Sequence, residues 1–147
     1  MLFMHFQSLT VSCFVNDRPC ELKIHGNQLY MKDFIITLEH NVKGIVFGCQ
    51  KFFLIFEAFL SNDCRDMEFK NNMSAYDYNG NYLYDVGELI QTPTHFVSAR
   101  INVKTSEEEN IYPQIPIGHE YMTCFCFDRS FILDITDDQL ITVEDLR

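Results

Sequence analysis

Cysteine and histidine are the residue types in this chain that are best suited to covalent chemistry. Cys124 or Cys126, with His119 or His95 and an aspartate such as Asp134, would supply the residue types of a nucleophilic triad. Both cysteines lie in an unbroken apolar run, where burial raises the pKa of a thiol and suppresses its reactivity. We therefore expect all six cysteines to be reduced and none to be catalytic.

Metal and cofactor motifs are missing from the sequence. Cys124 and Cys126 place two sulfur atoms on one face of a strand, but no second Cys or His pair stands at finger or ribbon spacing. The sequence contains no GxGxxG, no Walker loop and no HExxH. Adjacent carboxylates lie in loop-like contexts, where they are normally solvated. The sequence thus predicts no catalytic residues, no metal site and no cofactor.

Charge is distributed unevenly along the chain. The formal net charge is −10, and residues 105–147 carry ten acidic side chains against two basic ones. A field of this sign repels nucleic acid and attracts basic proteins. We therefore expect a surface in this segment that binds a protein partner, with exposed tyrosines as its apolar anchors. The residues expected to contact the partner are Glu107, Glu108, Glu109, Asp128, Asp137, Asp138, Glu144, Asp145, Tyr76 and Tyr78.

The elements that position these side chains are short strands, because apolar residues recur with a period of two. Turn signals such as Gly26-Asn27 and Thr136-Asp137-Asp138 separate the runs. The predicted strands are Leu2–Phe6, Leu9–Val15, Glu21–His25, Gln28–Met31, Phe34–Glu39, Ile45–Phe47, Lys51–Phe59, Met73–Tyr78, Asn81–Val86, Phe96–Val103, Glu120–Asp128, Phe131–Ile135 and Leu140–Glu144. Helix is expected only as single turns at Asp85–Ile90 and Thr142–Leu146.

Two runs, Lys51–Phe59 and Tyr121–Phe127, are apolar at both odd and even positions. Strands of this kind must be covered on both faces. The predicted fold is therefore mainly β, an antiparallel β-sandwich or strongly curled sheet built from hairpins.

Asn79 and Gly80 predict a tight two-residue type I′ hairpin, because both residues tolerate positive φ. This turn pairs Tyr76 with Leu83 and Ala75 with Tyr84. It places Met73, Ala75, Tyr84 and Val86 on one face of the sheet.

A gapless alignment places Ala75–Ile90 over Ile132–Arg147 and matches Asp77 with Asp134. Because only two copies exist, we interpret the similarity as a shared hairpin form and not as a repeat architecture.

With 147 residues, 47% of them of hydrophobic type, the chain fits a single domain covering residues 1–147. Its N-terminus lacks a basic region and a cleavage site, and polar residues interrupt every apolar run. We expect a cytoplasmic protein that does not insert into membranes; its oligomeric state stays open.

The segments MSAYDYNGNYLYDVGELI and FCFDRSFILDITDDQLITVEDLR, in an acidic β chain without enzyme motifs, resemble small bacterial immunity proteins of polymorphic-toxin and contact-dependent growth inhibition systems. The resemblance covers about the last half of the chain. It implies a cytoplasmic protein that binds and neutralises one cognate toxin domain, commonly a basic nuclease. It carries over no functional residues, because these proteins are similar in general character and share no sequence motif that could be matched.

Two other classes of function remain open. A small enzyme or ligand-binding β-barrel would use the many Phe and Tyr residues to line a pocket. A self-associating structural β protein would need a long, uncharged edge strand.

Overall fold

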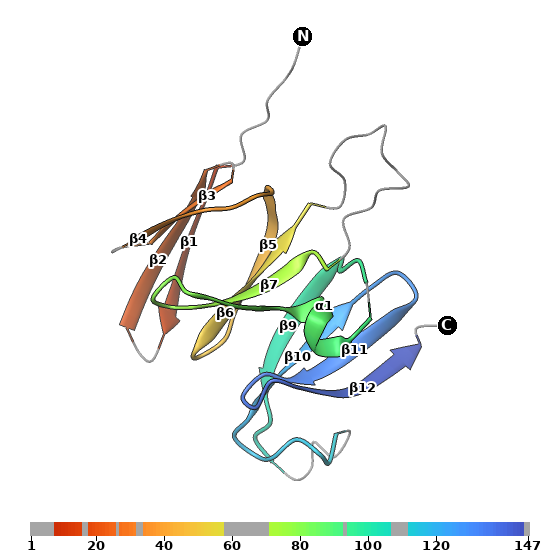
Figure 1. The fold of residues 1–147 in the computed structure, drawn as a ribbon. Helices are drawn as coiled ribbons and strands as arrows, with labels where there is room; N and C mark the ends of the chain where they lie inside the picture. The colour runs from red at the N-terminus through yellow and green to blue at the C-terminus, as the bar shows by residue number, and fades with distance from the viewer. Residues whose placement is uncertain are drawn as a thin grey trace, which may run out of the picture.

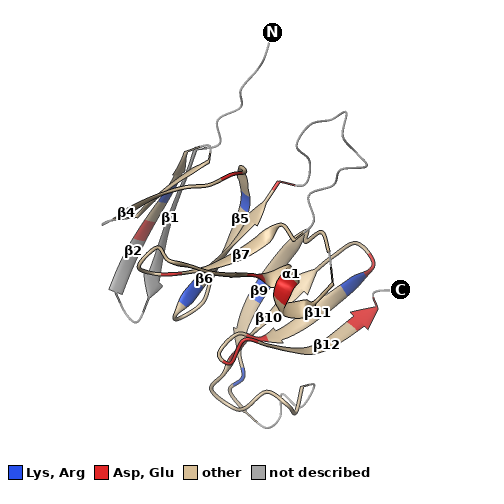
Figure 2. Ribbon diagram, in the orientation of Figure 1, with Lys and Arg blue, Asp and Glu red and all other residues tan. Residues whose placement is uncertain are grey.

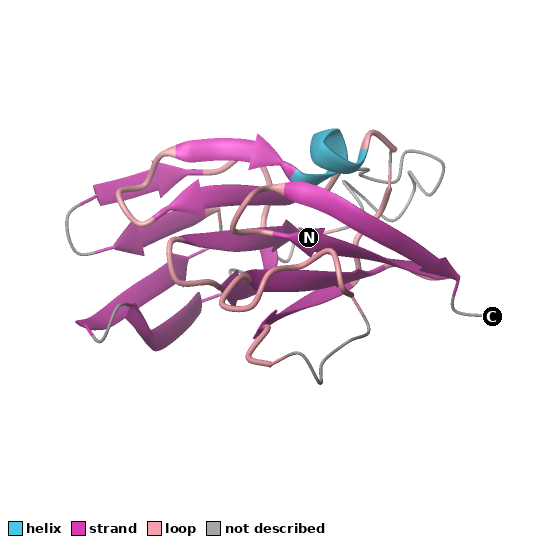
Figure 3. Cartoon of the chain, turned by 90° about the horizontal axis from the view of Figure 1, so that it is seen from below, coloured by secondary structure: helices cyan, strands magenta, loops and turns pink. Residues whose placement is uncertain are grey.

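The computed structural model describes residues 8–15, 18–25, 27–31, 34–57, 71–92, 94–106 and 112–145, with only the backbone described before residue 21. Strands make up most of the described chain, and its regular structure includes one short helix (Figure 1, Figure 3). The predicted strand Leu2–Phe6 and residues Glu107–Glu109 lie outside these ranges.

The described strands form three antiparallel sheets of four strands each, in which neighbours in sequence are neighbours in space. Sheet A consists of β1 (Ser8–Val15), β2 (Arg18–His25), β3 (Gln28–Met31) and β4 (Phe34–Thr37). Sheet B consists of β5 (Val42–Phe47), β6 (Lys51–Phe56), β7 (Met73–Asp77) and β8 (Tyr82–Asp85). Sheet C consists of β9 (Ser98–Val103), β10 (Glu120–Phe125), β11 (Arg129–Asp134) and β12 (Gln139–Asp145). Helix α1 (Val86–Ile90) connects sheet B to sheet C.

Sheet B lies between the other two because β6 is apolar on both faces. Phe53 and Ile55 belong to one hydrophobic core shared with sheet C, the B–C core. Phe52 and Leu54 belong to a second core shared with sheet A, the A–B core. The predicted cover on both faces of this strand is confirmed, and the mainly β, antiparallel fold class is confirmed with it. The described strands form open sheets, so the barrel considered as an alternative is not the architecture they adopt.

The internal similarity marks equivalent positions in two sheets. Ala75 lies on β7 and Ile132 on β11, and each of these strands is the third of its sheet. The expectation of a shared hairpin form is confirmed. Beyond this hairpin, the described strands form a four-stranded antiparallel sheet three times, in the same strand order. This strand order is the one found in the blades of β-propellers.

The hairpin between β7 and β8 differs from the predicted type I′ turn. Ala75 pairs with Tyr84 as expected, but the register then shifts and Tyr76 pairs with Tyr82. Gly80 has a φ of 86°, and Asn79 does not have positive φ. The side chain of Asp77 accepts hydrogen bonds from the backbone N–H groups of Asn79 and Asn81, and these bonds hold a longer loop.

The two single helical turns have different outcomes. The turn expected at Asp85–Ile90 is present as α1. The turn expected at Thr142–Leu146 is wrong, because β12 continues as strand to Asp145 and pairs with Arg129 of β11. The strand pairing overrides a local sequence that is compatible with helix.

Candidate functional site

Polar side chains gather where the β5–β6 turn meets the β11–β12 turn, at an end of sheets B and C that we call the B–C rim. Lys51 donates from Nζ to Asp138 Oδ1 at 2.6 Å, and Tyr84 donates its hydroxyl to the same oxygen at 2.6 Å. The backbone N–H of Cys49 donates to Glu120 Oε1 at 2.9 Å. Asp138 of the β11–β12 turn therefore binds two residues of sheet B, and Glu120 of β10 binds the β5–β6 turn.

Burial and hydrogen bonding change the acidity of the tyrosine at this rim. The hydroxyl of Tyr84 is largely removed from water and donates to the Asp138 carboxylate, and both effects raise the pKa of Tyr84 well above its usual value. The pKa of the Cys49 thiol is raised as well, by burial first and then by the charge of Glu120. Neither group is activated as a nucleophile, because the raised pKa keeps both protonated at neutral pH.

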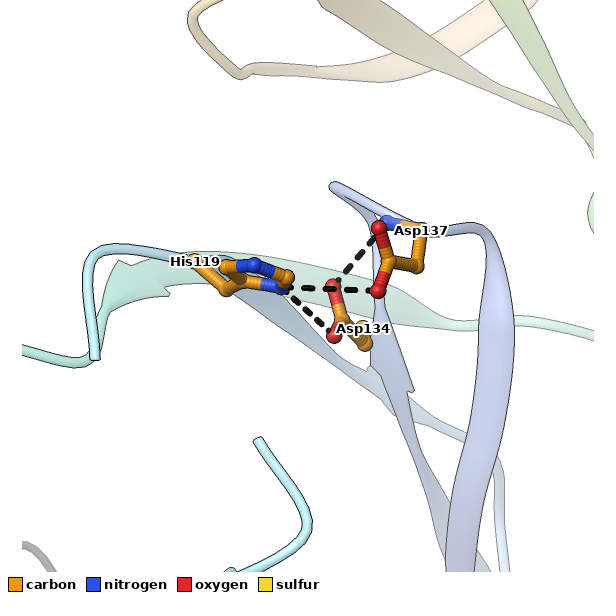
Figure 4. A group of neighbouring side chains, drawn as sticks. All are labelled: His119, Asp134 and Asp137. Atoms are coloured by element: carbon orange, nitrogen blue, oxygen red, sulfur yellow. Dashed lines mark hydrogen bonds and ion pairs between the residues drawn. The ribbon is translucent and has the colours of Figure 1, made fainter. Parts of the chain in front are cut away.

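Next to these contacts, His119, Asp134 and Asp137 lie together (Figure 4). His119 Nδ1 lies 2.9 Å from Asp134 Oδ2 and 3.9 Å from Asp137 Oδ2. The other oxygen of Asp134 accepts hydrogen bonds from the backbone N–H groups of Thr136 and Asp137. Asp134 thus closes the β11–β12 turn and orients the imidazole of His119.

Only two of the three residues of the hypothetical nucleophilic triad lie together. The structure brings His119 and Asp134 together, but Cys124 points into the B–C core and is fully buried. Asp134 pairs with Tyr121, three positions along β10 from Cys124, which corresponds to about 10 Å of strand. Burial raises the pKa of Cys124 strongly and that of Cys126 to about 11, so neither thiol is activated.

The predicted partner-binding residues of sheet C fall at two opposite ends (Figure 2). Asp137 and Asp138 lie in the β11–β12 turn. Asp128 lies in the β10–β11 connection, near Arg129, which pairs with Asp145. The length of β12 separates the two groups by about 20 Å. They cannot form one continuous contact unless a partner covers the whole strand.

Three of the predicted contact residues have internal roles that the sequence did not indicate. The carboxylate of Asp138 accepts hydrogen bonds from Lys51 and Tyr84. Tyr76 is only 8% exposed and stacks on Phe52 in the A–B core. Tyr78 is half-buried and donates its hydroxyl to the carbonyl of Gly48. The expectation that Tyr76 is exposed is therefore wrong, since β7 pairs with β6 without a shift and its alternation places Tyr76 on the face toward sheet A.

The grouping of His119, Asp134 and Asp137 was missed as a unit by sequence reasoning. A signal was present, because pairing the predicted strands around Phe127–Arg129 places Asp134 opposite Tyr121. His119 precedes that tyrosine by two positions. The hairpin register, not the spacing in sequence, brings the three side chains together.

Comparisons with known proteins bear on the fold. No protein-family model and no curated protein sequence matches the chain significantly. Two crystal structures of BBS1N in complex with ARL6DN are similar, one soaked with mercury and one with lead. Their TM-scores are 0.56 and 0.53, at 13% and 12% sequence identity. The likeness is one of fold.

In both cases the similarity covers 86% of this chain and 36% of the BBS1N chain. The chain therefore spans about a third of the length of the structures it matches. The described residues contain no helix of the length and apolarity that spanning a membrane requires.

Proposed function

We propose that this protein is a protein-binding module that holds a basic partner along β12. The observation that carries the proposal is the position and composition of this strand. β12 is the last strand of sheet C, and among the described strands only β11 pairs with it. A free strand edge offers backbone N–H and C=O groups to an extended segment of another protein.

The side chains of β12 suit such a partner. Leu140 and Val143 are exposed, although both are apolar. Glu144 and Asp145 are exposed at the end of the strand. Apolar contacts desolvated in the centre of an interface supply affinity, while acidic side chains at its border speed the approach of a basic partner.

The comparison of folds supports the class of function. BBS1N, whose fold is similar, was crystallised in a complex with another protein. The narrower proposal is that the partner is a cognate bacterial toxin domain of basic, nuclease type, which this protein neutralises. That part rests on the acidic composition and on the resemblance of the two hairpin segments to immunity proteins.

The test uses the full chain and, as candidate partners, the basic proteins that genes next to its own encode. We expect Glu144→Gln with Asp145→Asn to slow association at low salt, and Val143→Asp to speed dissociation, both measured by surface plasmon resonance. Glu21→Gln is the matched control, because Glu21 is an exposed acid on sheet A. Equal association rates for the β12 double variant and the control would contradict docking along β12.

Survival of cells that express the neighbouring protein tests the narrower proposal separately. Neutralisation predicts that growth is restored by the wild-type chain and is lost with Val143→Asp. Binding without any growth defect from the partner alone would refute the toxin proposal and leave the binding proposal standing.

A further inference from the structure

Three side chains of types that bind metal ions converge at the start of the β11–β12 turn. The ligand atoms of His119, Asp134 and Asp137 all lie within 4.8 Å of one another. They come from the residue before β10, the end of β11 and the turn that follows it. Figure 4 shows the imidazole directed toward both carboxylates.

The Asp134 carboxylate is the feature that sets this group apart from exposed acids on the surface. Asp134 is 2% exposed, and one of its oxygens is held by two backbone N–H groups. Its other oxygen faces His119. A buried carboxylate is stabilised by hydrogen bonds and by nearby positive charge. Among the described residues its ion-pair partner is His119, which carries a charge only when protonated, and no Lys or Arg pairs with it.

The geometry points to a divalent metal site in which His119 Nδ1, Asp134 Oδ2 and the Asp137 carboxylate are the protein ligands. Ligand bonds of about 2.0–2.2 Å place neighbouring ligand atoms about 3.0–3.5 Å apart around the ion. The separation of His119 from Asp134 is already 2.9 Å. Asp137 is at 3.9 Å and needs only a small rotation, which its exposed position in a turn permits.

The donor set indicates the class of ion. An imidazole nitrogen with two carboxylates suits Zn²⁺ and its neighbours in the transition series, whereas Ca²⁺ and Mg²⁺ prefer oxygen ligands only. Three protein ligands leave a coordination position for water. The bound ion would place a positive charge directly beside the buried Asp134 carboxylate.

Isothermal titration of the chelator-treated full chain with Zn²⁺ alone tests the site. The background is Cys49→Ser, because Cys49 is an exposed thiol and thiolates are ligands of zinc. We expect one equivalent to bind, with His119→Gln and Asp137→Asn each weakening the affinity by at least about tenfold. Asp128→Asn, an exposed acid of the β10–β11 connection, is the control and should change it less than about twofold.

Folding of each variant is verified first by its melting temperature without metal. Asp134→Asn is not used, because Asp134 also holds the turn. A Co²⁺-loaded sample gives an independent readout, and its spectrum should lack a thiolate charge-transfer band. Absence of Zn²⁺ binding, equal affinities for Asp137→Asn and Asp128→Asn, or a thiolate band would each overturn the assignment.

Discussion

Asp138 joins two sheets through one oxygen atom, which accepts both the ammonium group of Lys51 and the hydroxyl of Tyr84. The ion pair is partly buried, so solvent screens it less than a pair on the open surface. Tyr84 packs against the B–C core with its ring and reaches Asp138 with its hydroxyl. This tyrosine therefore couples the packing of the core to the charge at the rim.

The raised pKa of Tyr84 predicts how stability depends on alkaline pH. In the unfolded chain a tyrosine loses its proton near pH 10, whereas folded Tyr84 keeps it. Above pH 10 the folded state thus binds more protons than the unfolded state, and stability falls as pH rises. We expect Tyr84→Phe to flatten this fall while costing about 0.5–1.5 kcal/mol at neutral pH through the lost hydrogen bond.

Urea unfolding at a series of pH values from neutral to alkaline measures both effects. Cys124 and Cys126 also have raised pKa values, so a smaller alkaline loss persists in the variant. Parallel curves for Tyr84→Phe and the wild-type protein would show that Tyr84 ionises alike in both states.

At the scale of single residues, the sequence predicted the burial of Cys124 well and the contacts of other residues poorly. Burial of Cys124 followed from its apolar run, and the structure confirms it. The roles of Asp138 and Tyr76 did not follow. Asp138 meets Lys51 and Tyr84 only once sheets B and C are packed together, and no local pattern encodes a contact between sheets.

The β7–β8 hairpin shows how one element is fixed by a neighbouring sheet. Its Gly80 has positive φ, and a Cβ atom at this position would lie 2.5 Å from the ring of Phe34 on β4. The glycine is required twice, by the backbone conformation and by the close approach of sheet A. The hairpin tip is thereby tied to a strand far from it in sequence.

Comparison of two glycines separates these requirements. Gly118 has a similar φ of 91°, but nothing lies within 4 Å of a Cβ atom placed there. We expect Gly118→Ala to cost about 1–2 kcal/mol from backbone strain alone. Gly80→Ala should cost more, because Phe34 must also move. Chemical denaturation of both variants gives the two free energies of unfolding.

The background Phe34→Leu provides the control for this comparison. A smaller side chain on β4 should reduce the cost of Gly80→Ala toward that of Gly118→Ala and should leave Gly118→Ala unchanged. Equal costs for both glycines in the wild-type background would rule out the clash with Phe34.

Strand positions were predicted better than turn geometry. The pattern located β3 at Gln28–Met31 as observed, and most other strands within a few residues. The turn at Asn79 and Gly80 was misjudged because Asp77 caps a longer loop with its side chain. The pattern Asn79-Gly80 alone does not reveal this cap, nor the closeness of Phe34 to Gly80.

At the scale of the whole molecule, the threefold use of one sheet topology could not be read from the sequence. Sheets B and C share a recognisable hairpin, but sheet A has no counterpart of it in the alignment. Four-stranded sheets require only a period of two and turns, so many sequences satisfy the same topology. The same sheet topology therefore occurs in all three sheets, although their sequences are not recognisably repeated.

Reactivity of single thiols measures whether the B–C core opens only by global unfolding. Cys49 is exposed in the β5–β6 turn, whereas Cys124 is fully buried in the B–C core. We expect a thiol reagent to label Cys49 rapidly and Cys124 only at the rate of global unfolding, read by mass spectrometry of the peptides. Addition of sub-denaturing urea should accelerate the labelling of Cys124 and leave the labelling rate of Cys49 unchanged. Labelling of Cys124 as fast as Cys49 would contradict a closed B–C core.

The position of sheet B has a consequence for the growing chain on the ribosome. Sheet A and sheet B are complete once β8 has been made, but the face of sheet B that carries Phe53 and Ile55 is covered only by the later sheet C. Between these two moments the nascent protein displays an apolar surface with strand edges beside it, the kind of surface that favours aggregation and recruits chaperones. The rate of translation across residues 86–145 then determines how long that surface stays open to other molecules.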